Sequence, residues 1–100
     1  MDEAKLEQAI QDKGKTAPRL TPDKIDSLIK EEDYHLFWQL TVCCLTLENG
    51  FQTIGTSACV SPENFDEDIG KGIARDKARE KIWELEGYYL KQLLHLGQQG

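Results

Sequence analysis

The sequence predicts an α+β fold in one domain: a helix, a two-stranded antiparallel β-hairpin and a long C-terminal helix. Three observations support this fold. Thr21 and Pro22 form a helix-start signal, Asn49-Gly50 lies inside a β-prone run, and the last third has apolar residues at helical spacing. A chain of 100 residues suits a single domain. We expect a flexible N-terminal extension, one α-β-β-α domain and a short tail, at 1–19, 20–96 and 97–100.

The composition favours a protein of the cytosol. The chain is 39% hydrophobic and 30% charged, with a formal charge of −6 that argues against nucleic-acid binding. No apolar run approaches the ~20 residues of a membrane span, and the acidic start lacks a signal core. We therefore expect no membrane association and no export.

Three cysteines fit a reducing compartment. Cys43 and Cys44 are adjacent, so in a strand they face opposite sides, which suits neither a metal site nor a simple disulfide. With Cys59 the count is odd. We interpret all three as small buried hydrophobes and expect no cofactor; a catalytic thiol, the minor alternative, would need His35 or His95 nearby.

The first 13 residues can form a short charged helix. Leu6, Ala9 and Ile10 give it a thin apolar stripe. So few apolar groups predict fraying rather than docking. Residues 14–18, GKTAP, have the composition of a linker.

The segment LTPDKIDSLIKEE predicts a helix of about ten residues. Thr21 suits the N-cap, and Pro22 suits the first helical position. Ile25, Leu28 and Ile29 then share one apolar face.

A β-hairpin follows from Tyr34 onward, where Thr, Val, Cys and aromatic residues dominate. Asn49-Gly50 suits a two-residue type I′ turn. That turn places Leu45 opposite Ile54 and makes neither face of the ribbon cleanly polar. Both faces are therefore expected to be partly covered.

The last third predicts a helix that begins at Ser61-Pro62. Its apolar residues form two stripes on opposite sides, with a changeover and an allowed bend at Gly70–Gly72. The first stripe is Phe65, Ile69 and Ile73, and the second is Ala74, Ala78, Ile82, Leu85, Tyr89, Leu93 and Leu96.

The two-faced hairpin and the two-striped helix together carry more apolar surface than one copy can bury. We expect a homo-oligomer, at least a dimer, with the second stripe or the outer sheet face at the interface. The alternative is that the first helix and a bent C-terminal helix cover everything within one monomer.

The basic run KGIARDKAREK holds the candidate binding residues. Lys71, Arg75 and Arg79 lie four residues apart and share a helix face. Interleaved acids favour ordinary surface ion pairing. The sharper hypothesis is that these cations reach an anionic ligand beside an oligomer interface, because arginine binds phosphate bidentately.

Aromatic residues lie close to this run. Trp83 and Tyr88 are expected to fill the core against the hairpin, and the alternative is a stacking surface for a base or a protein partner. The glycines at 70–72 suit helix packing better than a phosphate loop. No nucleophile–base pair, metal-ligand spacing or nucleotide-binding loop is present in the sequence, so we expect no enzyme.

The sequence resembles the phage gp-forty-nine/sixty-six family, a group of small tailed-bacteriophage proteins, over about residues 18–95. The pieces that carry the resemblance are LTPDKIDSLI, LTVCCLTLENGF, SACVSPENFD, IARDKAREKIW and LEGYYL. The resemblance implies a phage-encoded accessory protein made in the cytoplasm of a bacterial host. It supplies no catalytic residues, because the family has no assigned function.

These observations lead to three hypotheses. The first is a non-enzymatic counter-defence or host-modulating protein that sequesters a small anionic signalling nucleotide at an oligomer interface, with Lys71, Arg75, Arg79 and Trp83 as ligand-binding residues. The second is a direct protein–protein inhibitor of a host or defence enzyme. The third is a replication factor that binds nucleic acid.

Overall fold

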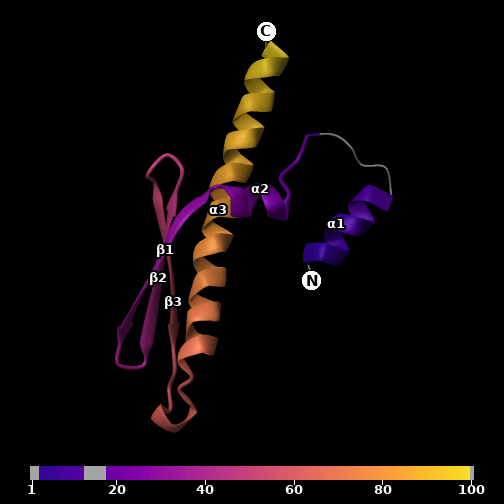
Figure 1. Ribbon diagram of the computed structural model, residues 1–100. Coiled ribbons are helices and arrows are strands. Elements are labelled where there is room, and N and C mark those ends of the chain that lie inside the picture. The colour runs from indigo at the N-terminus through magenta and orange to yellow at the C-terminus, as the bar shows by residue number, and fades with distance from the viewer. Residues whose placement is uncertain (1–2, 13–17, 100) are drawn as a thin grey trace.

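The computed structural model describes residues 3–12 and 18–99. Figure 1 shows a long helix, α3, with the strands along one side of it and α1 on the other. The dimensions are 56 × 32 × 19 Å. The elements in chain order are α1 (Glu3–Asp12), α2 (Pro22–Ser27), β1 (Ile29–Phe37), β2 (Leu40–Leu47), β3 (Gln52–Ala58), a 3-10 turn η1 (Pro62–Asn64) and α3 (Glu67–Gln99).

Helix α2 begins as predicted and ends early. The Thr21 hydroxyl accepts a hydrogen bond from the Lys24 N–H at 3.2 Å, and Pro22 is the first helical residue. Ile25 is fully buried. The predicted length of about ten residues is wrong, because the chain becomes a strand at Ile29 after only six helical residues.

The sheet has three antiparallel strands in the order β1-β2-β3, so the predicted two-stranded hairpin is incomplete. The missed strand β1 carries Lys30, Glu31, Glu32 and Asp33. Charged residues are typical of an edge strand, where they discourage pairing with other chains, and they hid the β pattern in the sequence. The α+β class is confirmed.

The turn between β2 and β3 is one residue longer than predicted. Glu48, Asn49 and Gly50 form a three-residue loop in which the Gly50 N–H donates to the Leu47 carbonyl at 2.8 Å. Gly50 has φ +88°, which suits glycine. The register therefore shifts by one, and the predicted pairing of Leu45 with Ile54 is wrong: Leu45 lies opposite Thr53.

The core lies between α3 and the inner face of the sheet. Small residues let the two backbones approach closely: a Cβ on Gly55 would lie 2.0 Å from the Ala74 carbonyl oxygen and 2.3 Å from the Ala78 nitrogen. The Thr53 hydroxyl donates to the Ala78 carbonyl at 3.0 Å. Strand β3 therefore lies directly against the helix backbone. The buried apolar residues are Ile25, Cys43, Leu45, Leu47, Ala74, Ala78 and Ile82.

Helix α3 is one unbroken helix of 33 residues, and Gly70–Gly72 does not interrupt it. It begins at Glu67, later than predicted; the Asp66 carboxylate accepts from the Ile69 N–H at 3.0 Å and caps it. Ser61-Pro62 instead begins the 3-10 turn. The C-terminal end of α3 extends beyond the sheet (Figure 1).

Both predicted stripes of α3 remain partly exposed. In the second stripe Ala74, Ala78 and Ile82 are buried on the sheet within one copy, so this part of the stripe is not free for the expected oligomer interface. Farther along, Leu85 and Tyr89 are 43% and 57% exposed. Of the two faces of the sheet, only the inner one is covered by α3, so the expectation that both faces are covered is not met within one copy.

A strained turn joins β1 to β2. Trp38 has φ +59°, a conformation that bulky residues rarely adopt, and its side chain is 85% exposed. Phe37, beside it, is 56% exposed. This hairpin end therefore presents two aromatic side chains to solvent.

At the N-terminus, Glu3–Asp12 form α1, a short helix that the sequence allows; the expected fraying of this extension stays a prediction. The expected linker at 14–18 lies almost wholly outside the described residues. Where α1 is described, ion pairs join it to the rest of the chain: Glu7 to Arg19 at 2.6 Å and Glu3 to Arg79 at 2.5 Å.

The close approach at Gly55 predicts the cost of adding one methyl group there. Gly55→Ala must push α3 away from β3, which we expect to lower the free energy of unfolding by about 1–3 kcal/mol or more. Gly72→Ala makes the same chemical change in α3 where nothing lies within 4 Å. This control should raise the free energy of unfolding by up to about 1 kcal/mol. Urea unfolding followed by circular dichroism measures both, and equal effects would contradict the close packing.

Candidate functional site

Four side chains in a row on α3 form the candidate site: Lys71, Arg75, Arg79 and Trp83, each four residues from the next. These are the residues that the sequence predicts. The structure brings them together along one face of the helix, beside β1, α2 and α1. We call this set the cationic row.

Arg79 is the most enclosed cation of the row, with a side chain 13% exposed. Its Nε donates to Asp26 of α2 at 2.8 Å, and its Nη1 donates to Glu3 of α1 at 2.5 Å. The hydrogen bonds from Glu3 and Asp26 raise the pKa of Arg79 above its ordinary value. Arg79 thus ties two N-terminal elements to α3.

Arg75 and Lys71 continue the row toward the start of α3. The Arg75 Nε donates to Glu32 of β1 at 3.0 Å; burial opposes the charge, but this contact outweighs it and the pKa of Arg75 is raised. Lys71 pairs with Glu67 at 2.9 Å, which raises the pKa of Lys71. Its ammonium also lies 5.6 Å from the centre of the Tyr34 ring.

Trp83 ends the row at a cavity of about 290 Å³, which we call the α1 cavity. Trp83 is half-buried and packs against the core. The cavity walls are largely apolar, and two acidic residues of α1, Glu3 and Glu7, are among the lining residues. The lining residues are Glu3, Leu6, Glu7, Ile10, Leu20, Pro22 and Trp83.

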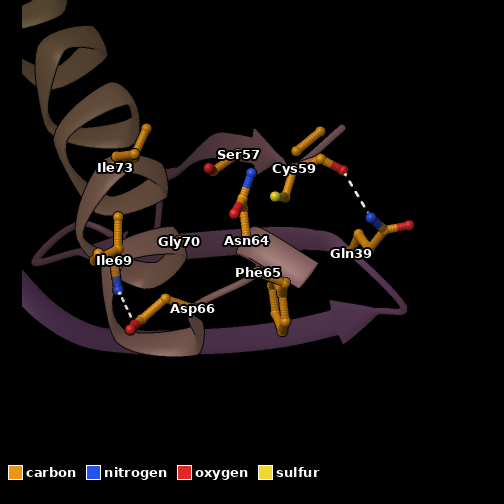
Figure 2. Close-up of a pocket in the computed structure, with 10 residues that line it drawn as sticks. Gln39, Ser57, Cys59, Asn64, Phe65, Asp66, Ile69, Gly70 and Ile73 are labelled. Atoms are coloured by element: carbon orange, nitrogen blue, oxygen red, sulfur yellow. Dashed lines mark hydrogen bonds between the residues drawn. The ribbon is translucent and has the colours of Figure 1, made fainter. Parts of the chain in front are cut away.

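A second cavity, of about 150 Å³, lies between the start of α3 and the end of β3 (Figure 2). Two of the polar side chains around it are bonded within the protein. The Gln39 amide donates to the Cys59 carbonyl at 3.0 Å, and Asp66 caps α3. Ile69 and Ile73 of the first stripe line it. This small cavity has no cation to hold an anion among its lining residues.

The described residues offer little for metal or thiol chemistry. Among them, no three His, Cys, Asp or Glu side chains are grouped to hold a metal ion. Cys43 is buried, as predicted, and burial raises the pKa of its thiol. Cys44 and Cys59 are only half-buried.

The chemistry that the cationic row can support is different. Its guanidinium groups can hold anions, and Trp83 can stack on a planar ring.

Sequence reasoning found the cations and missed their partners. Glu3, Asp26 and Glu32 come from three different elements, and only the fold brings them to the row. The positions of Asp26 and Glu32 in the sequence do not indicate that they pair with the row. Asp26 lies in α2 and Glu32 in β1, and strand β1 was not predicted. The interpretation of Tyr88 as a core residue is wrong, since it is 73% exposed.

The fold is that of a small α+β protein with one long C-terminal helix. A family model for the phage protein (N4 Gp49/phage Sf6 gene 66) family matches residues 20–94. The chain belongs to this phage protein family, which confirms the resemblance seen in the sequence. Comparisons with curated proteins and with solved structures gave no match. Helix α1 lies outside the matched residues. Within the described residues, no helix is both long and apolar enough to span a membrane.

Proposed function

We propose that this phage protein acts by binding, and that it sequesters a small anionic signalling nucleotide in the host bacterial cytoplasm as a counter-defence or host-modulating factor. The observation that carries the proposal is the cationic row, in which two arginines and a lysine lead to Trp83 and the α1 cavity. Phosphates would pair with the guanidinium groups, and a base would stack on the indole.

The carboxylates that now pair with the row are compatible with this role. Glu32 and Asp26 are partly exposed, at 36% and 50%, so a phosphate can replace them without stranding a buried charge. A phosphate offers more acceptor oxygens than one carboxylate and suits the planar arginine fork. The row would therefore exchange an internal partner for a ligand.

Exposed apolar surface supports a homo-oligomer as the binding form. Beyond Ile82, the second stripe has Leu85, Tyr89, Leu93 and Leu96 between 43% and 57% exposed. A contiguous apolar surface of this kind typically marks an interface. Two-fold pairing of copies would provide the row twice, as a symmetric ligand requires.

Ligand binding is tested with purified protein and a panel of cyclic mono-, di- and trinucleotides. A bound nucleotide at about 100 times its Kd adds about 2.7 kcal/mol of stability, which raises Tm by roughly 10–20 °C. Arg75→Gln removes one arginine fork and should weaken binding by about 10- to 100-fold in calorimetry. Lys77→Gln, an exposed position off the row, removes the same charge and should leave Kd unchanged.

Two outcomes would contradict the nucleotide proposal. One is an unchanged Tm with every cyclic nucleotide at saturating concentration. The other is equal weakening in Arg75→Gln and Lys77→Gln, which would mean that general charge rather than the row attracts the anion. Recovery of the intact nucleotide after denaturing the complex separates sequestration from hydrolysis.

A second candidate function is direct inhibition of a host or defence enzyme, and the β1-β2 turn favours it. Trp38 is held at φ +59° and is 85% exposed, so the protein keeps a strained conformation that places an aromatic side chain in water. Tryptophan is among the residues that dominate binding energy in protein interfaces.

Trp38→Gly tests this second function. Glycine adopts positive φ without strain, so the free energy of unfolding should rise by about 1 kcal/mol while the aromatic contact is lost. Co-purification from infected cells should then recover a host protein with the wild-type chain and lose it with Trp38→Gly. If both chains recover the same partners in equal amounts, Trp38 is no interface anchor.

A further inference from the structure

Helix α1 lies on the cationic row in the manner of an acidic ligand. Glu3 and Glu7, one helical turn apart, reach Arg79 and Arg19 at 2.5 Å and 2.6 Å. Leu6 and Ile10, between and beyond them, line the same cavity wall as Trp83. Helix α1 thus presents carboxylates to arginines and apolar groups to the indole.

Helix α1 is joined to the rest of the protein by ion pairs at two of its residues. Arg79 donates a hydrogen bond to Glu3 and Arg19 donates two to Glu7, and a cavity lies between part of the apolar face of α1 and Trp83. Leu6 remains 46% exposed, so little apolar area is buried by docking. A helix of ten residues is also marginal in water on its own. The helical state of α1 therefore depends on its contacts with the rest of the chain, the ion pairs of Glu3 and Glu7 among them.

We infer that α1 is a built-in competitor for the anion-binding site, which an incoming phosphate-bearing ligand must displace from Arg79 and the α1 cavity. This inference rests on the proposed function. The Glu3 carboxylate occupies the Arg79 fork that a phosphate needs, and docked α1 lies over the Trp83 wall. Ligand affinity is reduced by the fraction of molecules in which α1 is docked. Because the family match begins at residue 20, this control belongs to the segment that precedes the shared fold.

The decisive variant is Glu3→Gln in the full chain, since it removes the competing charge and keeps the size of the side chain. Glu84→Gln, an exposed position on α3, changes the net charge equally and serves as the control. Inorganic pyrophosphate is the probe for calorimetry, and hydrogen exchange reports on the α1 amides.

For Glu3→Gln we expect pyrophosphate to bind about threefold or more tightly than to the wild type, with faster exchange in α1 before any ligand is added. Pyrophosphate should also accelerate α1 exchange in the wild type. Glu84→Gln should match the wild type in both measurements.

The results separate this inference from the proposed function. If pyrophosphate binds wild type and Glu3→Gln with equal Kd, the site stands and the competitor role of α1 is wrong. If pyrophosphate protects α1 from exchange, α1 closes over the ligand and the competitor role is also wrong. If pyrophosphate and the cyclic nucleotides bind no variant, the proposed function itself fails.

Discussion

The direct contact between the backbone of α3 and strand β3 is the constraint on which the rest of the structure depends. Gly55 leaves no room for a side chain between the strand and the Ala74–Ala78 turn, and the Thr53 hydroxyl bonds to the helix carbonyl there. A contact made of small residues buries little apolar area for each residue. Larger buried side chains must therefore complete the core, and these include Ile25 from α2 and Ile82 farther along α3. Ile82 is the last buried residue among those described in α3.

The position of this contact decides which parts of the helix are free to act. Residues of α3 on the sheet side are committed to packing, whereas the row from Lys71 to Trp83 faces α1, α2 and the edge strand β1. There the cations hold α1, α2 and β1 through charge-assisted hydrogen bonds to partly exposed carboxylates, which water and salt can weaken. Past Ile82 none of the described side chains of the helix is fully buried, and several of its apolar side chains are exposed to solvent. The proposed binding groups thus lie beside the contact between α3 and β3 rather than in it.

The parts of this fold that follow local rules could be predicted from the sequence. The Thr21 cap, the apolar stripe that holds Ala74, Ala78 and Ile82, and the shared face of the cationic row each depend on spacing along one element. The predictions that were wrong concern features that depend on contacts between elements far apart in the sequence. Strand β1 carries charged residues that suit an edge strand, and its β conformation depends on its pairing with β2 rather than on its own sequence pattern. The register depended on whether Glu48 joined the turn, a difference of one residue that helical or strand propensity cannot fix. Pairing of Arg79 with Glu3 joins residues 76 apart.

Hydrogen exchange along α3, followed from dilute to concentrated protein, tests most directly the proposal that the sheet stabilises the first half of this helix and that a second copy covers its far end. The account predicts slow exchange at residues 74–82 at every concentration, and exchange at residues 88–97 that is fast in dilute protein and slows as copies meet. Uniform protection along α3 that does not depend on concentration would contradict it, since a single copy would then hold the whole helix.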